Sequence, residues 1–275
     1  MRETRQKIKH IAKETMIGRF FKILALMLLS YLTSALLVKV FSLIGTNYRP
    51  DATVEVFGLT VNYISVSAGI LTSLLSAPLE LGICEYVLGL IRKKEVRFIN
   101  VFSWYGELPK LGRAVPFGIW SVFTSVFQVA LFDIPLAYIQ GQLELVLEDI
   151  QEQANAGTEF IIPNYTLMDG RGIAIAVGAM LAVAVLGTLF VAVKYFYVDT
   201  GKLFFSVFSS LAVMIRHLWS YIVFVLSFSG FYFGTMFTFG LLGVYLLPYF
   251  GMSQAAFVEY VRAKAKFDGK GEAWV

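Results

Sequence analysis

The apolar run YISVSAGILTSLLSAPLELGICEYVLGLI, residues 63–91, constrains the fold of this chain more than any other segment. A helix of about 20 apolar residues is enough to cross a membrane, and this run is longer than that. Yet it contains a proline, Pro78, and two carboxylates, Glu80 and Glu85. A segment of this kind has to be a membrane helix that meets other protein on part of its surface.

Small or polar residues recur along the run every three or four positions, at Ser65, Gly69, Ser73, Ser76, Glu80 and Cys84. On an α-helix these positions form one stripe, which predicts one side facing protein and another facing lipid. An ionised carboxylate in hydrocarbon is unfavourable, so we expect Glu80 to point into a helix bundle and to have a partner there. The remaining helices are then expected to surround this stripe.

Composition also indicates a membrane protein. Of the 275 residues, 57% are hydrophobic and 15% are charged, and the mean hydropathy is +0.70. Soluble domains have roughly 45–50% apolar and 25% charged residues. The chain has one cysteine, Cys84, which excludes an internal disulfide framework. Its two histidines, His10 and His217, are far apart in the sequence and do not indicate a zinc site.

Sequence motifs of common enzymes are absent. The chain has no GxSxG elbow, no phosphate-binding loop and no cluster of metal ligands at a recognisable spacing. We therefore predict that the protein is not an enzyme and has no cofactor, no bound metal and no nucleic-acid partner.

The hydropathy pattern predicts an all-α fold, a polytopic transmembrane helix bundle with amphipathic surface helices. We expect one integral membrane domain, 1–275. Its six transmembrane helices are expected at 23–44, 63–91, 114–138, 172–198, 218–237 and 240–261. At the N-terminus we expect a basic amphipathic segment at 1–22 that lies on the cytoplasmic membrane surface, or else is a solvated basic tail. Short surface helices are expected near 98–105, with Trp104 and Tyr105 at the lipid headgroups, and at 203–216. The remaining segments are a turn-rich outer loop at 45–62, an acidic extracellular loop at 141–171 whose first half is helical, and a cytoplasmic tail at 262–275.

The distribution of basic residues predicts the orientation. With six crossings, 20 of the 23 Lys and Arg fall on one side, and Lys39, Arg49 and Arg171 fall on the other. Basic residues accumulate on the cytoplasmic side of membrane proteins. Both termini are therefore expected in the cytoplasm.

Two stretches carry a resemblance to a known family: SLLSAPLELGICEYVLGLIRKKEVRFINVF in the first half and LSFSGFYFGTMFTFGLLGVYLLPYFGMSQAAFVEYV near the end. They resemble the domain-of-unknown-function 975 family of bacterial, mostly Gram-positive, membrane proteins. The similarity lies in APLELG at 77–82, LSFSG at 226–230 and LPY at 247–249, whereas the acidic segment 141–171 departs from the short turn of the family. The resemblance implies a multi-pass protein of the bacterial cytoplasmic membrane and no particular activity. A more distant resemblance to the membrane domain of some glycerophosphodiester phosphodiesterases points toward lipids.

Five charged residues within the expected crossings are the candidates for an intramembrane polar site. Lys39 and Asp133 have the same expected depth near the outer ends of their helices, and Glu80, Glu85 and Lys194 lie toward the inner ends. Such residues often mark a proton or substrate pathway. The alternative is that Lys39, Glu85 and Lys194 reach the headgroups and have no further role. For Glu80 the first candidate partner is Lys194, with Tyr or Ser hydroxyls next, although Lys194 is level with Glu85 and Glu80 lies one turn shallower.

Two prolines and two glycines are expected to shape the helices. Pro78 and Pro248 interrupt expected helices in opposite halves of the chain, a pattern found in transporters with broken helices. Gly230 and Gly234 have the spacing that lets two helices approach closely. Packing remains the more common role for residues of these types.

Two functions fit this sequence. In the first, the bundle has a polar inner stripe that binds or moves a small or lipidic molecule. In the second, the protein is a structural or partner-binding subunit of a membrane or cell-envelope complex, and its surface helices and acidic loop contact another membrane protein. The lipid bilayer is an expected partner in both.

Overall fold

The structure is a computed structural model that describes residues 2–48, 53–56, 59–128, 134–155 and 170–267. Asp133, residues 156–169 of the expected acidic loop and the end of the expected tail, 268–275, lie outside the described residues. The elements in chain order are α1 (Arg2–Met16), α2 (Phe20–Tyr48), β1 (Thr53–Val56), β2 (Leu59–Asn62), α3 (Tyr63–Ile91), η1 (Phe98–Phe102), α4 (Ser103–Gly106), α5 (Leu108–Gln128), α6 (Ile134–Asn155), α7 (Gly170–Phe190), α8 (Val193–Thr200), α9 (Leu203–Leu226), α10 (Ser229–Phe237) and α11 (Leu241–Phe267).

The predicted helical class is confirmed for the described residues, with one exception. The exception is the antiparallel hairpin of β1 and β2, in which Thr53 pairs with Asn62 and Val56 with Leu59. We expected only an irregular loop in this segment. By its internal contacts the chain forms two compact units, one of residues 1–122 and 188–275 and the other of residues 123–187.

Five helical segments among the described residues are long and apolar enough to cross a membrane. They are Phe20–Phe41, Ser67–Ile91, Gly170–Thr200, Leu203–Phe237 and Leu241–Lys264. The expected crossing at 114–138 is the one without such a segment. Its first part lies in α5, residues 129–133 are outside the described residues, and α6 begins at Ile134.

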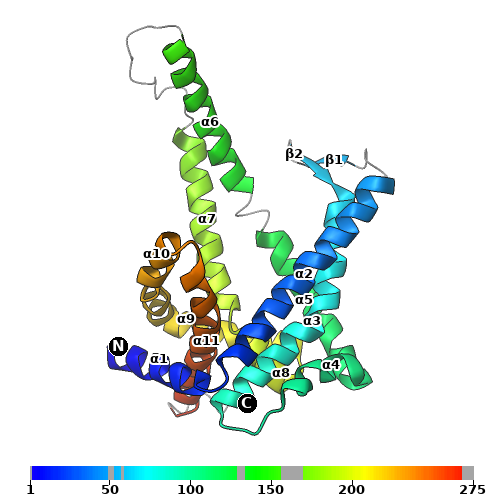
Figure 1. Ribbon diagram of the computed structural model, residues 1–275, viewed down its shortest axis with the longest axis vertical. Coiled ribbons are helices and arrows are strands. Elements are labelled where there is room, and N and C mark those ends of the chain that lie inside the picture. Colours follow the sequence, from blue (N-terminus) through cyan, green and yellow to red (C-terminus); the bar gives the residue numbers. More distant parts are fainter. Residues whose placement is uncertain (1, 49–52, 57–58, 129–133, 156–169, 268–275) are drawn as a thin grey trace. The chain divides into compact units, whose positions relative to one another are not determined.

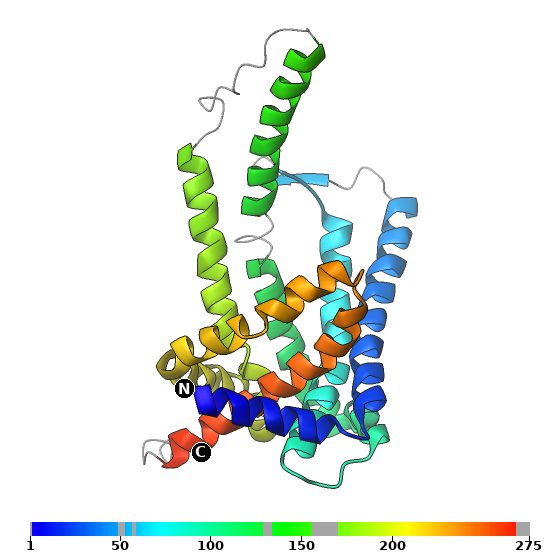
Figure 2. The same ribbon diagram turned by 60° about the vertical axis from the view of Figure 1, so that its left-hand side comes forward.

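Helix α3 occupies the centre of the larger unit. It contacts α2, α8, α11, α1 and the short helices η1 and α4, and Figures 1 and 2 show α2 and α3 running side by side. The half of α3 that follows Ser76 is the more buried half, with Leu79, Leu81 and Leu88 almost inaccessible. The prediction that other helices surround this segment is therefore confirmed over its second half.

A close backbone contact joins η1 to α3. A Cβ atom added to Gly82 would overlap the carbonyl oxygen of Val101, so only glycine allows this approach. Next to this contact, a buried cluster joins α3, α4, α5 and α8 through Ala77, Leu81, Trp104, Ala114, Phe117 and Tyr197. We expected Trp104 at the lipid headgroups. It is instead 3% exposed and belongs to this core, because its indole packs beneath α3.

Helix α1 is amphipathic as predicted, but its apolar face contacts protein. Ile8, Ala12 and Met16 recur every four residues and are buried, and α1 lies against α11 and α3. Figure 2 shows α1 running roughly crosswise to α2. Packing against the bundle thus holds α1 in place whether or not lipid is present.

Two breaks divide segments that we expected to be single helices. The expected helix 172–198 is divided at residues 191–192, between α7 and α8. Helix α9 is continuous and includes both the expected surface helix 203–216 and the first part of the expected crossing 218–237. A break at Ser227 and Phe228 then separates α9 from α10. Lys9 of α1 stabilises this second break, because its Nζ donates to the Ser227 carbonyl at 3.0 Å and lies 4.1 Å from the centre of the Phe228 ring.

The smaller unit consists of the end of α5, the whole of α6 and most of α7. Helix α6 extends to Asn155, so the first half of the expected acidic loop is helical as predicted. On α7, Ile175 and Leu181 are largely exposed, as expected for a helix surface that contacts lipid.

Candidate functional site: a polar cavity within the helix bundle

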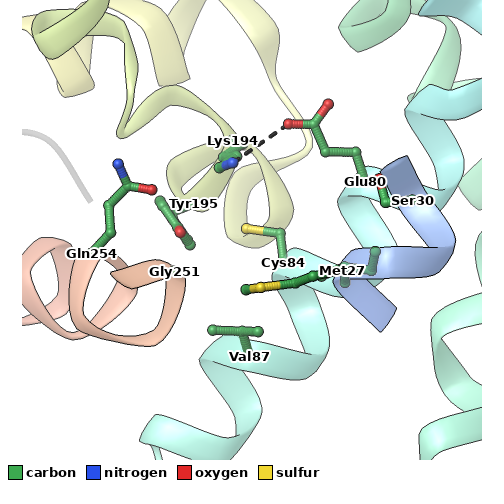
Figure 3. A pocket seen from close by; sticks show the side chains of 10 residues that line it. Met27, Ser30, Glu80, Cys84, Val87, Lys194, Tyr195, Gly251 and Gln254 are labelled. Atoms are coloured by element: carbon green, nitrogen blue, oxygen red, sulfur yellow. Dashed lines mark hydrogen bonds and ion pairs between the residues drawn. The ribbon is translucent and has the colours of Figure 1, made fainter. Parts of the chain in front are cut away.

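A half-open cavity of about 210 Å³ lies within the larger unit, where α2, α3, α8 and α11 meet (Figure 3). Its lining residues are Met27, Ser30, Glu80, Ile83, Cys84, Val87, Lys194, Tyr195, Gly251 and Gln254. Met27, Ile83 and Val87 give it an apolar wall, and the opposite charges of Glu80 and Lys194 lie together in its lining. The cavity therefore has the mixed lining that ligand sites in helix bundles have.

Glu80 and Lys194 form the ion pair that the sequence indicated. The Lys194 Nζ lies 3.5 Å from the Glu80 Oε1, at the long end of the hydrogen-bond range. The side chains keep 31% and 38% of their surface, Lys194 and Glu80 respectively. The pair is thus neither sealed in the core nor saturated by one short bond, and its remaining hydrogen-bonding capacity faces the cavity.

Local structure explains how the two charges meet. Glu80 lies on the small-residue stripe of α3, which leaves room beside it for another helix. Lys194 is in the first turn of α8, directly after the break at 191–192. Because α8 begins after that break and packs on α3, the Lys194 side chain reaches Glu80 from a neighbouring helix.

The position of Glu80 along α3 corresponds to the middle of a membrane crossing. Glu80 precedes Ile91, the last residue of α3, by eleven positions, or about 16 Å of helix. The hydrocarbon core of a bilayer is about 30 Å thick. A crossing formed by Ser67–Ile91 would therefore hold Glu80 near the midplane, where a carboxylate requires a partner.

Polar groups of α11 and α8 complete the lining. Gln254 donates through Nε2 to the Tyr221 hydroxyl of α9 at 2.7 Å, which fixes the amide at the cavity wall. The Lys194 ammonium lies 5.6 Å from the centre of the neighbouring Tyr195 ring. Gly251 leaves room for the Met27 side chain in the cavity wall, because a Cβ atom added to Gly251 would collide with the methyl group of Met27.

Of the other predicted charges, the two that the structure describes, Lys39 and Glu85, do not join this site. Glu85 accepts a hydrogen bond from the Trp104 indole at 2.7 Å and is not in the cavity lining. Lys39 is exposed on α2. Asp133, its expected partner, lies outside the described residues. Of the four candidate charges that the structure describes, Glu80 and Lys194 are the two that it brings together.

The predicted helix-breaking and packing residues have different surroundings. Helix α3 continues through Pro78 and α11 through Pro248. Beside Pro78, the Tyr105 hydroxyl donates to the carbonyl of Leu75 at 2.7 Å, a group in the turn that a proline perturbs. A Cβ at Gly234 would meet Leu242 at 2.7 Å, whereas no described atom lies within 4 Å of one at Gly230, so the close packing expected at Gly230 is not observed.

A charge network closes the bundle at the Ile91 end of α3. Arg92 donates two hydrogen bonds to Asp199 of α8 and two to Glu259 of α11, at 2.7–3.0 Å. Arg262 also pairs with Asp199 and lies over the Phe196 ring. Asp199 and then Glu259 hold the pKa of Arg92 above its usual value, so it stays charged. We call these residues, Arg92, Asp199, Glu259 and Arg262, the charge clamp.

Sequence reasoning missed Tyr195, Gln254 and the charge clamp. The sequence contains one usable signal for Gln254, an amide within the otherwise apolar run of α11. Arg92 and Arg262 were counted only as cytoplasmic charges, and nothing in their spacing indicates that they share partners.

The site has the chemistry of a binding cavity. It offers a carboxylate, an ammonium group, a phenol and an amide next to an apolar wall. Within the described residues, no group of three or more His, Cys, Asp or Glu is placed to hold a metal ion. No family model, curated protein or solved structure matches this chain.

Proposed function

We propose that this protein is a non-enzymatic membrane bundle that binds, or moves across the membrane, a small or lipidic molecule in the Glu80–Lys194 cavity. The single observation that supports the proposal most is the accessible ion pair at mid-helix depth. Both side chains line the cavity and keep about a third of their surface accessible, so a ligand in the cavity can reach them.

The lining suggests the chemistry of the ligand. A molecule with a hydrogen-bond donor and an acceptor near one end would bond to Glu80 and Lys194 at the same time. Its apolar part would lie along Met27, Ile83 and Val87. The cavity is smaller than the 300–1,000 Å³ that is typical of drug-sized ligands. A small amphiphile, or the polar head of a lipid whose tail extends out of the cavity, fits this volume.

The proposal is tested by analysing what the purified protein retains. The parent protein and the variants Glu80→Gln, Lys194→Gln and Glu85→Gln are purified in a mild detergent, and bound small molecules and lipids are identified by mass spectrometry. Glu85→Gln is the matched control, because it makes the same change on the same helix outside the cavity.

We expect a species that the parent and Glu85→Gln retain and that both cavity variants lose by about tenfold, the effect of one charged hydrogen bond. Identical profiles in all four proteins would refute a ligand site here. They would favour the alternative role as a structural or partner-binding subunit of a membrane or envelope complex.

We further propose six crossings, cytoplasmic termini and a location in the bacterial cytoplasmic membrane, as the family resemblance implies. The basic-residue distribution supports this orientation. The test is labelling of single cysteines in intact cells after removal of Cys84. Positions 51 and 155 should react with an impermeant reagent, and positions 94 and 268 should not. Reaction at position 94 would refute the scheme.

A further inference from the structure

A second pocket lies in the larger unit, between α1, α9 and α11. It has a volume of about 170 Å³. Its lining residues are Thr4, Arg5, Ile8, His217, Ser220, Val223, Phe257, Tyr260, Val261 and Lys264. Its only element in common with the Glu80–Lys194 cavity is α11, and the two cavities share no lining residue. No part of the proposed function involves this pocket.

The pocket is basic at its polar side and apolar at its floor. Arg5, His217 and Lys264 come from three different helices, and no carboxylate occurs in the lining that the structure describes. Ile8 and Phe257 are almost fully buried beneath it. Arg5 and Lys264 give the pocket a positive charge, and His217 adds to it when protonated, so the pocket attracts an anion.

Packing fixes the position of α1, the helix that carries Arg5. Ile8 and Ala12 anchor α1 in the bundle, and Lys9 ties the same helix to the break after α9 through the Ser227 carbonyl. Burial, and the nearby charge of Arg5, lower the pKa of Lys9. Positive charge is therefore concentrated at this end of α1, and the helix that carries Arg5 is held in place by packing.

The pocket lies in the part of the fold where a lipid headgroup is expected. Figure 2 shows α1 and the last turns of α11 at the same end of the larger unit as the loop that follows α3. On α9, Trp219 is 66% exposed close to His217, and Tyr260 lies at the pocket itself. Tryptophan and tyrosine are enriched where a membrane meets water.

We infer that this pocket binds a phosphate group, with Arg5, Lys264 and His217 contacting its oxygens and Ser220 and Tyr260 able to hydrogen-bond to it. Arginine recognises phosphate through two parallel hydrogen bonds, and lysine adds a point charge. The group can belong to an anionic phospholipid, whose glycerol and first methylenes would contact the apolar floor, or to a soluble phosphate ester.

The test compares two charge-matched double variants, R5Q/K264Q in the pocket and K7Q/K13Q on the exposed side of α1. Lys7 and Lys13 are exposed and do not line the pocket. Each protein is placed in nanodiscs with equal amounts of phosphatidylglycerol and phosphatidylcholine. After extraction into mild detergent, retained lipids are counted by native mass spectrometry. A second arm measures melting temperature in lipid-free detergent with inorganic phosphate or glycerol 3-phosphate, against sodium chloride at equal ionic strength.

If a lipid headgroup is the ligand, the parent and K7Q/K13Q retain phosphatidylglycerol preferentially and R5Q/K264Q loses that preference by about tenfold or more, as expected for the removal of charged hydrogen bonds. If the ligand is a soluble phosphate ester, the second arm responds instead. Phosphate or glycerol 3-phosphate then raises the melting temperature of the parent and of K7Q/K13Q but not of R5Q/K264Q.

A third variant covers the case in which R5Q/K264Q folds poorly. Ser220→Leu fills the pocket and leaves every charge in place, and it should abolish the same response. Equal losses in R5Q/K264Q and K7Q/K13Q would mean general attraction of a basic helix to anions. That outcome, or no response of the parent in either arm, refutes the site. Neither result depends on Glu80 or Lys194, so this proposal and the proposed function fail separately.

Discussion

Removal of Arg92 is the most direct test of how the helices are held at the Ile91 end of α3. The Arg92 guanidinium donates four hydrogen bonds, two to Asp199 and two to Glu259, and so joins α3 to α8 and α11 at once. In Arg92→Met the methionine keeps most of the apolar stem, and what is lost is the charge and its hydrogen bonds. Arg262 remains as the only basic partner in the charge clamp.

The magnitude follows from the burial of the pair. Exposed ion pairs contribute about 0–1 kcal/mol, whereas breaking a fully buried pair costs roughly 3–5 kcal/mol. The side chains of the charge clamp keep between 16% and 31% of their surface, so the clamp lies between these two limits. Because Arg262 still neutralises part of the acidic charge, we expect Arg92→Met to lower the free energy of unfolding by about 2–3 kcal/mol.

The measurement is equilibrium unfolding in mixed micelles of mild detergent and sodium dodecyl sulfate, followed by tryptophan fluorescence. Lys94→Met, an exposed position in the following loop, is the charge-matched control and should change the free energy by less than about 0.5 kcal/mol. Arg92→Lys should lose about 1 kcal/mol or more, because an ammonium group cannot bond both carboxylates in pairs. If Arg92→Met and Lys94→Met are equally stable, the clamp does not hold the helices together.

Three further substitutions test the contacts between α3 and the short helices, by the same unfolding measurement. Gly82→Ala should lower the free energy of unfolding by roughly 2–3 kcal/mol, because the added methyl group collides with the η1 backbone. The control Gly112→Ala should have little effect, because there is open space at that position. Equal effects of the two substitutions would refute the close approach. Trp104→Phe should cost about 1–3 kcal/mol, since the Glu85 carboxylate loses its indole donor, and a neutral result would show that water replaces that donor. Tyr105→Phe should cost about 1 kcal/mol or less, because one partly exposed hydroxyl bond to the turn before the proline is lost; a gain in stability would mean that the bond is strained.

Local sequence patterns determined much of the helical structure. Segment 63–91 was predicted with the bounds that α3 has, because its length, apolar composition and small-residue stripe are all properties of a single helix. The amphipathic helix at the N-terminus and the short helices near 98–105 follow from equally local periodicity. Boundaries were less accurate at 172–198 and 218–237, since apolar composition continues through the breaks at 191–192 and at Ser227 and Phe228.

The candidate site was predictable only in part. A buried carboxylate needs a partner, and depth made Lys194 the first candidate for Glu80, ahead of Tyr or Ser hydroxyls. By depth alone, however, Lys194 was level with Glu85 and one turn away from Glu80. The same reasoning gave Glu85 no distinct role, because a depth argument cannot tell on which side of α3 another helix packs. In the structure the two acidic side chains point in different directions, because Glu80 faces α8 and Glu85 faces Trp104.

By itself, then, the sequence determined that this chain forms apolar helices, which of them carry charges, and that Glu80 requires a partner, because these properties depend on composition and on spacing along one helix. Only the tertiary structure decided that Arg92 joins three helices, that Trp104 is core rather than headgroup anchor, and that Gly82, not Gly230, permits a close approach. Contacts between helices depend on rotation and distance, and neither quantity is encoded in the periodicity of a single segment.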